Sequence, residues 1–256
     1  GEDLSSPEMS SLMDLIMTGE LSSAQIASCI VAIKIKGETL DEITAAASVM
    51  RKHSNKVIVE DSRYLIDTCG TGGDSLQTFN VSTLSAIIAA AAGARVAKHG
   101  GRSVSSKCGS ADVLEVLGVN VNLDHKRLGQ LVDAIGIGFM FAPNYHPAMK
   151  YVAPVRKELE IRTMFNLLGP LTNPASAERQ IVGVYSKELT TTFAKVLKNL
   201  GSKHVLVVHG DDGMDEISIT GKTFVAELKD NVIKEYTIEP SLFKLKEGSL
   251  KDIVVN

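Results

Sequence analysis

The first fifty residues carry apolar side chains at the spacing of α-helices. Met9, Met13 and Ile16 fall on one helical face, and Ser6 followed by Pro7 predicts where this helix begins. Two more helices are predicted by capping boxes, in which a hydroxyl residue precedes Gln or Glu by three positions: these pairs are Ser22 with Gln25 and Thr39 with Glu42. Because each helix is short, we expect the three to gain stability by packing together.

From residue 64 the pattern changes to short apolar strands that alternate with helical segments. Strands are expected at 64–66, 95–97, 138–141, 181–185 and 205–208, and helices from 81, from 111 and over 190–200. This alternation predicts an α/β fold with a mainly parallel central sheet. Residues 147–173 return to helical periodicity and are expected to fold back onto the N-terminal helices. The predicted organisation is a small discontinuous helical domain, residues 1–58 and 144–175, and a larger α/β domain, residues 59–143 and 176–256.

Composition narrows the classes of function. The 256 residues include 27 Lys and Arg against 30 Asp and Glu, a net charge of −3, and 44% are hydrophobic. This balance excludes a disordered chain and argues against a nucleic-acid-binding protein, which needs a basic surface. Aromatic residues make up 5% and Trp is absent, so stacking platforms for single-stranded nucleic acid are not expected either.

The cysteines and the apolar runs indicate a compartment. Cys29, Cys69 and Cys108 are odd in number and far apart, which favours a reducing environment. The first residues have neither the basic nor the apolar run of a signal peptide, and the most apolar window, 84–94, is shorter than the roughly 20 residues of a membrane span. We therefore expect a cytoplasmic protein that does not bind membranes.

A glycine-rich segment, D-T-C-G-T-G-G-D at 67–74, follows the first predicted strand. Its glycines allow backbone N–H groups to approach a ligand, and N-V-S-T at 80–83 then opens a helix whose N-terminus favours anions. Together they are typical of a phosphate cradle, although Ser75 stands where a Rossmann motif needs Gly and no Walker lysine follows. A tight structural turn with an ordinary helix cap is the alternative.

Two further segments place charge at predicted strand ends. K-H-G-G-R-S-V-S-S-K-C-G-S at 98–110 combines cations, hydroxyls and glycines, which suits an anion. H-G-D-D-G-M-D-E at 209–216 offers carboxylates that suit Mg²⁺ together with substrate phosphates. Because the ends of parallel strands meet at one edge, we expect these segments and the glycine-rich one to share a crevice. Each by itself is also compatible with a solvated surface loop.

A fourth candidate lies in the helix predicted after His146. Arg156 stands ten residues further on, near the same face at about 100° per residue, where its guanidinium would hold a carboxylate in a bidentate fork. A capping histidine and a surface arginine are the alternative.

In combination these motifs resemble the anthranilate phosphoribosyltransferase family. The resemblance covers nearly the whole chain and includes H-P-A-M-K-Y-V-A-P-V-R at 146–156 and F-N-L-L-G-P-L-T-N-P at 165–174. It implies a helical domain through which the protein forms a homodimer, an α/β domain, and Mg²⁺ as cofactor. The implied reaction, in tryptophan biosynthesis, moves the phosphoribosyl group of 5-phosphoribosyl 1-pyrophosphate (PRPP) to the amine of anthranilate and releases pyrophosphate.

The resemblance also assigns roles to residues of this chain. PRPP would be held by Gly70, Thr71, Gly72, Gly73, Asp74, Thr78, Asn80, Ser82, Thr83, Lys98 and Ser110. Anthranilate would contact Gly70, His99, Gly101, His146 and Arg156, with Arg156 on its carboxylate. The Mg²⁺ ligands would be Ser82, Asp215 and Glu216. No general base or nucleophile is expected, because electrostatic stabilisation and positioning suffice for this chemistry.

Two departures from the family pattern affect these expectations. The family usually has Asn in K-H-G-N-R, where this chain has Gly101, so one contact to the acceptor is missing. The family is also longer at its C-terminus, so we expect a chain truncated within the α/β domain, and we expect Gly1 to be a cloning remnant. The alternatives are a pyrimidine nucleoside phosphorylase, a non-catalytic relative that binds nucleic acid, and an inactive fragment.

Overall fold

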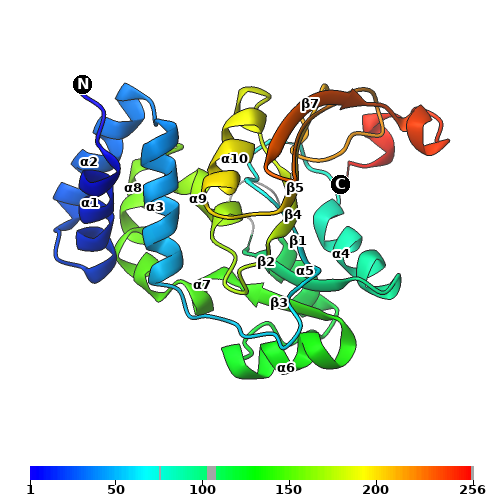
Figure 1. Ribbon diagram of the computed structural model, residues 1–256, viewed down its shortest axis with the longest axis horizontal. Helices are drawn as coiled ribbons and strands as arrows, with labels where there is room; N and C mark the ends of the chain where they lie inside the picture. The colour runs from blue at the N-terminus through cyan, green and yellow to red at the C-terminus, as the bar shows by residue number, and fades with distance from the viewer. Residues whose placement is uncertain (75, 103–107, 255–256) are drawn as a thin grey trace.

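The computed structural model describes residues 1–74, 76–102 and 108–254, which form one sheet with helices on both faces (Figure 1). Within these residues, seven strands lie in the order β3-β2-β1-β4-β5-β6-β7. Their bounds are β1 Leu65–Gly70, β2 Arg95–Gly100, β3 Ile137–Phe141, β4 Arg179–Gly183, β5 His204–Gly210, β6 Thr223–Lys229 and β7 Val232–Ile238. The pairings from β3 to β5 are parallel and the last two are antiparallel, so the predicted α/β class is confirmed.

The strand order reverses between β1 and β4. From β1 the chain continues through β2 and β3 on one side, and it then crosses back to place β4 and β5 on the other. β1 and β4 run side by side to their last residues, where Gly70 pairs with Gly183. Such a reversal opens a crevice at the carboxyl ends of the strands, where open α/β sheets bind ligands.

The three N-terminal helices form where the sequence predicts them, and each begins with a capping box. The first box is made by Ser5 with Glu8, so the prediction that Ser6 caps this helix was wrong. Ser6 is the first helical residue, and Pro7 follows in the turn where no amide donor is needed. The helices are α1 Ser6–Thr18, α2 Ser23–Lys36, α3 Leu40–Lys52, α4 Val81–Ala91, α5 Ser110–Val116, α6 His125–Ile135, α7 Ala142–Tyr145, η1 Pro147–Tyr151, α8 Ala153–Leu159, α9 Phe165–Leu171, α10 Glu188–Asn199, η2 Pro240–Phe243 and η3 Leu250–Asp252.

Helices α9 and α10 lie between the sheet and the N-terminal helices, and α4 packs on the opposite face of β1 and β2 (Figure 1). α3 contacts both α9 and α10, and α2 contacts α8, so the segment predicted to fold back onto the N-terminal helices does so. One apolar core runs from Met9 in α1 through Leu168 in α9 to Val182 in β4. This shared core fixes the helical layer relative to the sheet.

Several strands are longer than predicted. β1, β2 and β5 extend through Gly70, Gly100 and Gly210, so the residues expected in loops, such as Lys98, lie partly inside strands. Helix α6 and the hairpin of β6 and β7 were not predicted. Across the described ranges, no helix combines the length and the apolar character needed to cross a membrane.

Candidate active site

The glycine-rich loop at the end of β1 is shaped by its contacts to β4. Gly72 and Gly73 have φ angles of 65° and 82°, a conformation that residues with side chains rarely adopt. The amide of Thr71 donates to the carbonyl of Gly183 (2.9 Å), and the Thr71 hydroxyl accepts a hydrogen bond from the amide of Tyr185 (3.1 Å). The loop is therefore anchored at Thr71 and turns sharply at the two glycines.

The acidic turn after β5 packs directly against this loop. The amide of Gly72 donates to Oδ2 of Asp215 (2.8 Å), although the two residues are 143 positions apart. A Cβ on Gly70 would lie 2.6 Å from the same oxygen, and a Cβ on Gly183 would lie 2.5 Å from the carbonyl carbon of Asp215. Glycine at both positions is what allows the turn to approach the ends of β1 and β4. The two segments meet at the ends of β1 and β4.

Three carboxyl groups, those of Asp74, Asp215 and Glu216, gather here, and the guanidinium of Arg162 donates to the carbonyl of Gly73 in the same loop. Burial, reinforced by the charge of Asp215, raises the pKa of Glu216 to about 8. Burial and Asp215 also raise the pKa of Asp74 to about 6, and burial raises the pKa of Asp215 itself. Lys98 is the cation that opposes the shift of Glu216. Such a site suits a divalent cation, whose charge would stabilise the ionised carboxylates.

Ser82, at the start of α4, lies next to Lys98 and Glu216. The ammonium of Lys98 donates to the Ser82 hydroxyl (3.1 Å) and to the carbonyl of Thr68, while the Ser82 backbone hydrogen-bonds to the carboxylate of Glu216. Within the described residues, no three His, Cys, Asp or Glu side chains are arranged to enclose a metal ion. The carboxylates of Asp215 and Glu216 beside Ser82 suit Mg²⁺, which usually binds one or two carboxylates together with substrate phosphates and water.

Helix α4 begins at Val81, and its first backbone amides are already hydrogen-bonded within the protein. Asn80 occupies the N-cap position but makes no capping hydrogen bond, because its side chain donates to the carbonyl of Cys108 (3.0 Å). Thr83 donates to the hydroxyl of Ser110 (2.8 Å), the first residue of α5. These two links bring the ends of the segment 98–110 beside the first loop, and residues 103–107 of that segment lie outside the described residues. The start of α4 carries the positive end of the helix dipole, which favours an anion.

The connector before α4 is held by residues far along the chain. Thr78 pairs with Val254 in an isolated antiparallel bridge, and the amide of Phe79 donates to the carbonyl of Ile253 (3.1 Å). These contacts fix the connector that leads from the glycine-rich loop to the start of α4.

Two buried histidines face each other next to this crevice. The ring centroids of His99, in β2, and His146 are 5.0 Å apart, and each residue is 4% exposed. Nδ1 of His99 lies 3.2 Å from the carbonyl of Gly169, whereas its Nε2 and both ring nitrogens of His146 lack a well-formed hydrogen bond among the described residues. Burial lowers the pKa of His99 to about 3 and that of His146 to about 4, so both are neutral at pH 7. Buried polar atoms need partners, which a polar ligand would supply.

Gly101 and Arg156 are the other two residues of this region that the sequence predicts to contact the acceptor substrate. A Cβ on Gly101 would meet no atom of the described residues within 4 Å. Arg156 lies in α8, where burial lowers its pKa. The prediction that one continuous helix joins His146 to Arg156 was wrong, because the chain forms the 3-10 segment η1 and then breaks at Val152 before α8.

Four residues of this region were not identified from the sequence: Asp67, Asn173, Gln180 and Gly183. Asp67 is fully buried in β1, and its carboxylate accepts hydrogen bonds from the amide of His99 (3.0 Å) and from the side chain of Asn173 (2.7 Å). A lone carboxylate within the apolar stretch 65–69 was the available signal, since a buried charge requires partners. Asn173 gave no such signal, because Asn before Pro is an ordinary turn pattern.

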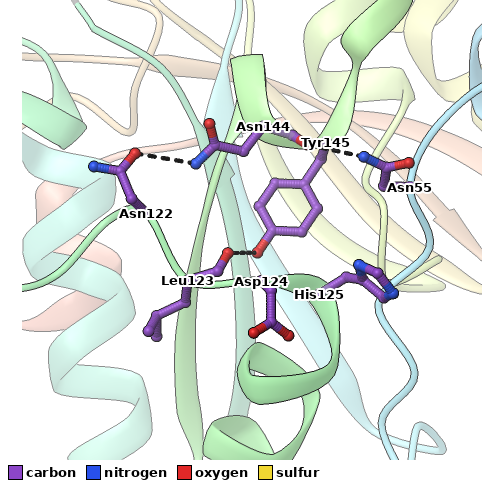
Figure 2. Close-up of a pocket in the computed structure, with 7 residues that line it drawn as sticks. All are labelled: Asn55, Asn122, Leu123, Asp124, His125, Asn144 and Tyr145. Atoms are coloured by element: carbon purple, nitrogen blue, oxygen red, sulfur yellow. Dashed lines mark hydrogen bonds between the residues drawn. The ribbon is translucent and has the colours of Figure 1, made fainter.

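A separate cavity of about 320 Å³ lies beside Tyr145 (Figure 2). Its polar walls bond to one another: the Tyr145 hydroxyl donates to the carbonyl of Leu123 (2.9 Å), and the Asn144 side chain donates to that of Asn122 (3.2 Å). Because these groups satisfy each other, we assign this cavity no ligand.

The chain matches known domain families over nearly its whole length. Residues 62–256 match the domain described as "Glycosyl transferase family, a/b domain", and residues 1–54 match "Glycosyl transferase family, helical bundle domain". Anthranilate phosphoribosyltransferase of Chromobacterium violaceum is 57% identical over 253 residues, which are 99% of this chain and 74% of that protein.

Two solved structures share the fold. Anthranilate phosphoribosyltransferase from Thermus thermophilus superposes with a TM-score of 0.93 at 43% identity, covering 100% of this chain and 75% of that one. The enzyme of the same name from Saccharomyces cerevisiae, in complex with PRPP and Mg, has a TM-score of 0.88 at 32% identity and covers 98% of this chain and 73% of its own.

Proposed function

The chain belongs to the anthranilate phosphoribosyltransferase family, and on that premise we propose how its residues transfer the phosphoribosyl group of PRPP to the amine of anthranilate. The products are N-(5-phosphoribosyl)anthranilate and pyrophosphate, a step in tryptophan biosynthesis. Family membership favours this transfer over nucleoside phosphorolysis and over nucleic-acid binding, which the sequence alone leaves open. The observation that carries the proposal is the meeting of the glycine-rich loop, the start of α4 and the acidic turn at one crevice.

The donor subsite is formed by the loop after β1 and the start of α4. Phosphate oxygens suit the positive end of the α4 dipole and the sharply turned backbone at Gly72 and Gly73, where no side chain obstructs them. Lys98, held between Thr68 and Ser82, supplies positive charge beside them. The remaining residues proposed for this subsite are Gly70, Thr71, Asp74, Thr78, Asn80, Thr83 and Ser110.

Ser82, Asp215 and Glu216 are proposed to hold Mg²⁺. Burial raises the pKa of both carboxyl groups, so a cation is needed to stabilise them as carboxylates. When bound, Mg²⁺ would neutralise the negative charge that develops on departing pyrophosphate. The relative from Saccharomyces cerevisiae was solved with PRPP and Mg, which supports placing the donor and the metal together.

The acceptor subsite is formed by the histidine pair, Gly70, Gly101 and Arg156. Nε2 of His99 is available for a polar group of anthranilate, and the ring of His146 faces it. Arg156 would pair with the carboxylate, since a guanidinium matches that group in a bidentate fork. Gly101 has no side chain, which leaves the aromatic ring free of a side-chain contact from that position.

Catalysis on this site rests on charge stabilisation and alignment. As the bond from ribose C1 to pyrophosphate breaks, Lys98 and the positive end of the α4 dipole stabilise the leaving charge. The amine of anthranilate is already neutral at pH 7, so alignment beneath C1 supplies the remaining acceleration. With pKa values of about 3 and 4, His99 and His146 are weak bases at that pH, which agrees with a reaction that needs no general base.

The loss of anthranilate fluorescence in the presence of PRPP and Mg²⁺ tests this function. The double variant Asp215→Asn/Glu216→Gln is expected to lose Mg²⁺-dependent turnover while keeping its circular dichroism spectrum. Turnover at the wild-type rate in that variant would refute the metal assignment, and a folded wild-type protein that consumes no anthranilate would refute the function.

We also propose that the protein forms a homodimer through its helical layer. An apolar groove of about 360 Å³ lies between α1 and α2 and is lined mainly by Leu12, Leu15, Leu21 and Ala24. A second copy of this layer would cover it. Light scattering on the Leu15→Glu variant is expected to show a monomer, and an unchanged mass would exclude this face as the interface.

A further inference from the structure

A buried hydrogen-bond cluster joins the donor strand to the acceptor side of the molecule. Asp67, three residues before the glycine-rich loop, is 0% exposed, and Asn173, just after α9, is 1% exposed. The side-chain amide of Asn173 donates to Oδ2 of Asp67 (2.7 Å) and to the carbonyl of Ala97 (2.9 Å). Its side-chain oxygen accepts from the amide of Ala175 (2.9 Å). Asn173 therefore links β1, β2 and the connection from α9 to β4.

The other oxygen of Asp67 controls the position of His99. Oδ1 accepts a hydrogen bond from the backbone amide of His99 (3.0 Å). Nδ1 of the same histidine lies 3.2 Å from the carbonyl oxygen of Gly169 in α9. Successive side chains of a strand point to opposite faces. Lys98 accordingly bonds to Ser82 on the α4 face, while His99 faces α9 and His146.

The cluster therefore stands between the two proposed subsites. β1 leads from Asp67 directly into the loop of residues 70–74, and β2 carries one side chain of each subsite in adjacent positions. α9 contributes to the packing of the helical layer and supplies the carbonyl of Gly169 that the His99 ring contacts. A small displacement between α9 and β1 would move the histidine pair relative to the loop without unfolding either element.

We propose that Asp67 and Asn173 are positioning residues, which align the acceptor subsite with the donor loop through the amide of His99. This inference rests on the proposed function. The rate of a bimolecular transfer depends steeply on such alignment, and a displacement of about 1 Å costs roughly 100-fold. Neither side chain contacts the reacting atoms in this role, so loss of the pair is expected to lower kcat while the KM for PRPP stays within about twofold.

A pair of exchange variants tests this role. Asn173→Asp places two carboxyl groups face to face and is expected to lower kcat about 10- to 100-fold. In the swap, Asp67→Asn/Asn173→Asp, the new amide at 67 again bridges to a carboxylate at 173. Among the described residues, the native cluster has five hydrogen bonds. The swap can re-form the one between positions 67 and 173 and those from the amides of His99 and Ala175. It loses the bond to the Ala97 carbonyl and the weaker one (3.5 Å) from the Gln180 side chain to Asp67. It is therefore expected to recover at least tenfold in kcat over Asn173→Asp.

Thr190→Val is the matched control for lost stability. Thr190 is 6% exposed and its hydroxyl donates to the carbonyl of Lys187 (2.8 Å), within α10 and away from the cluster. This variant is expected to lower Tm without changing kcat. If the swap is no faster than Asn173→Asp at an equal folded fraction, or if Asn173→Asp keeps the wild-type kcat, the positioning role is overturned.

Hydrogen exchange separates this proposal from the proposed function. In Asn173→Asp, the amide of His99 and those of residues 165–173 are expected to exchange faster, and the swap is expected to restore their protection. Unchanged exchange in Asn173→Asp overturns the inference whether or not the wild-type protein turns over anthranilate. Inactivity of a wild-type protein whose exchange pattern follows this expectation counts against the proposed function alone.

Discussion

The contact of Gly183 with the acidic turn gives the sharpest prediction about the site. In Gly183→Ala, the new Cβ would lie 2.5 Å from the carbonyl carbon of Asp215 and overlap its oxygen. Carbon atoms in contact are normally separated by about 3.5 Å, so the turn has to move by about 1 Å or more. That movement carries Asp215 and Glu216 away from the loop. We expect kcat to fall roughly 100-fold, and the Mg²⁺ concentration for half-maximal activity to rise.

The assay is anthranilate fluorescence recorded over a Mg²⁺ titration, with Tm measured in parallel. Overpacking of this kind costs about 1–3 kcal/mol of folding free energy, so the variant is expected to remain folded at 25 °C. Gly221→Ala is the matched control, because a Cβ there meets no atom within 4 Å in the described part of the chain. Wild-type kcat and Mg²⁺ dependence in Gly183→Ala would show that the turn does not depend on this close approach, and the reasoning would fail.

Three further predictions concern the acceptor side. His146 has a folded-state pKa of about 4, below the usual 6.5, so between these pH values the unfolded chain binds a proton that the folded chain excludes. The free energy of unfolding therefore falls as the pH drops from 6.5 toward 4. His146→Gln is expected to reduce this slope by about 1.4 kcal/mol per pH unit, measured by urea titrations at pH 5 to 6. Equal slopes would contradict a buried neutral histidine. Arg156→Ala is expected to raise the KM for anthranilate at least tenfold and that for PRPP less than twofold, and equal changes in both would exclude the carboxylate role. Gly101→Asn adds a Cβ that meets no atom of the described residues within 4 Å, and it is expected to lower the KM for anthranilate with no loss of Tm, whereas a lower Tm would show that the space is not free.

The elements that the sequence predicted best are those specified by local chemistry. The capping boxes at Ser22 and Thr39 mark helix starts within a few residues, and the structure forms both. The ends of β1 and β2 were missed because glycine and polar residues there look like a loop. Their strand conformation depends on pairing with β4 and β3, which lie far away in the sequence.

The local sequence of the β6–β7 hairpin contains a turn pattern typical of antiparallel strands. Asp230 and Asn231 both have positive φ angles, 49° and 64°, as in the two-residue turn that joins antiparallel strands. Residues of these types between two runs rich in Val, Ile, Phe and Tyr are a standard hairpin pattern. The hairpin is therefore encoded in its local sequence.

The residue types of the site could be predicted from the sequence, but the long-range contacts that hold them in place could not. Glycines, carboxylates and cations at strand ends indicated a phosphate and metal crevice before any fold was known. The contacts that shape the site could not be read from the sequence. Gly183 packs against the backbone of Asp215, 32 positions away, and Asp67 bonds to Asn173, 106 positions away. Such partners are set by the sheet order, which local patterns do not specify.

The hydrogen bond between Gly72 and Asp215 also has a consequence for protein synthesis. Ribosomes add about 5–20 residues per second, so the 143 positions between these residues correspond to roughly 7–30 s. During that time the nascent chain carries the glycine-rich loop and β1 to β3 but lacks β5 and the acidic turn. The cradle and its carboxylates therefore become a binding site together and late, after the helical layer has had time to fold.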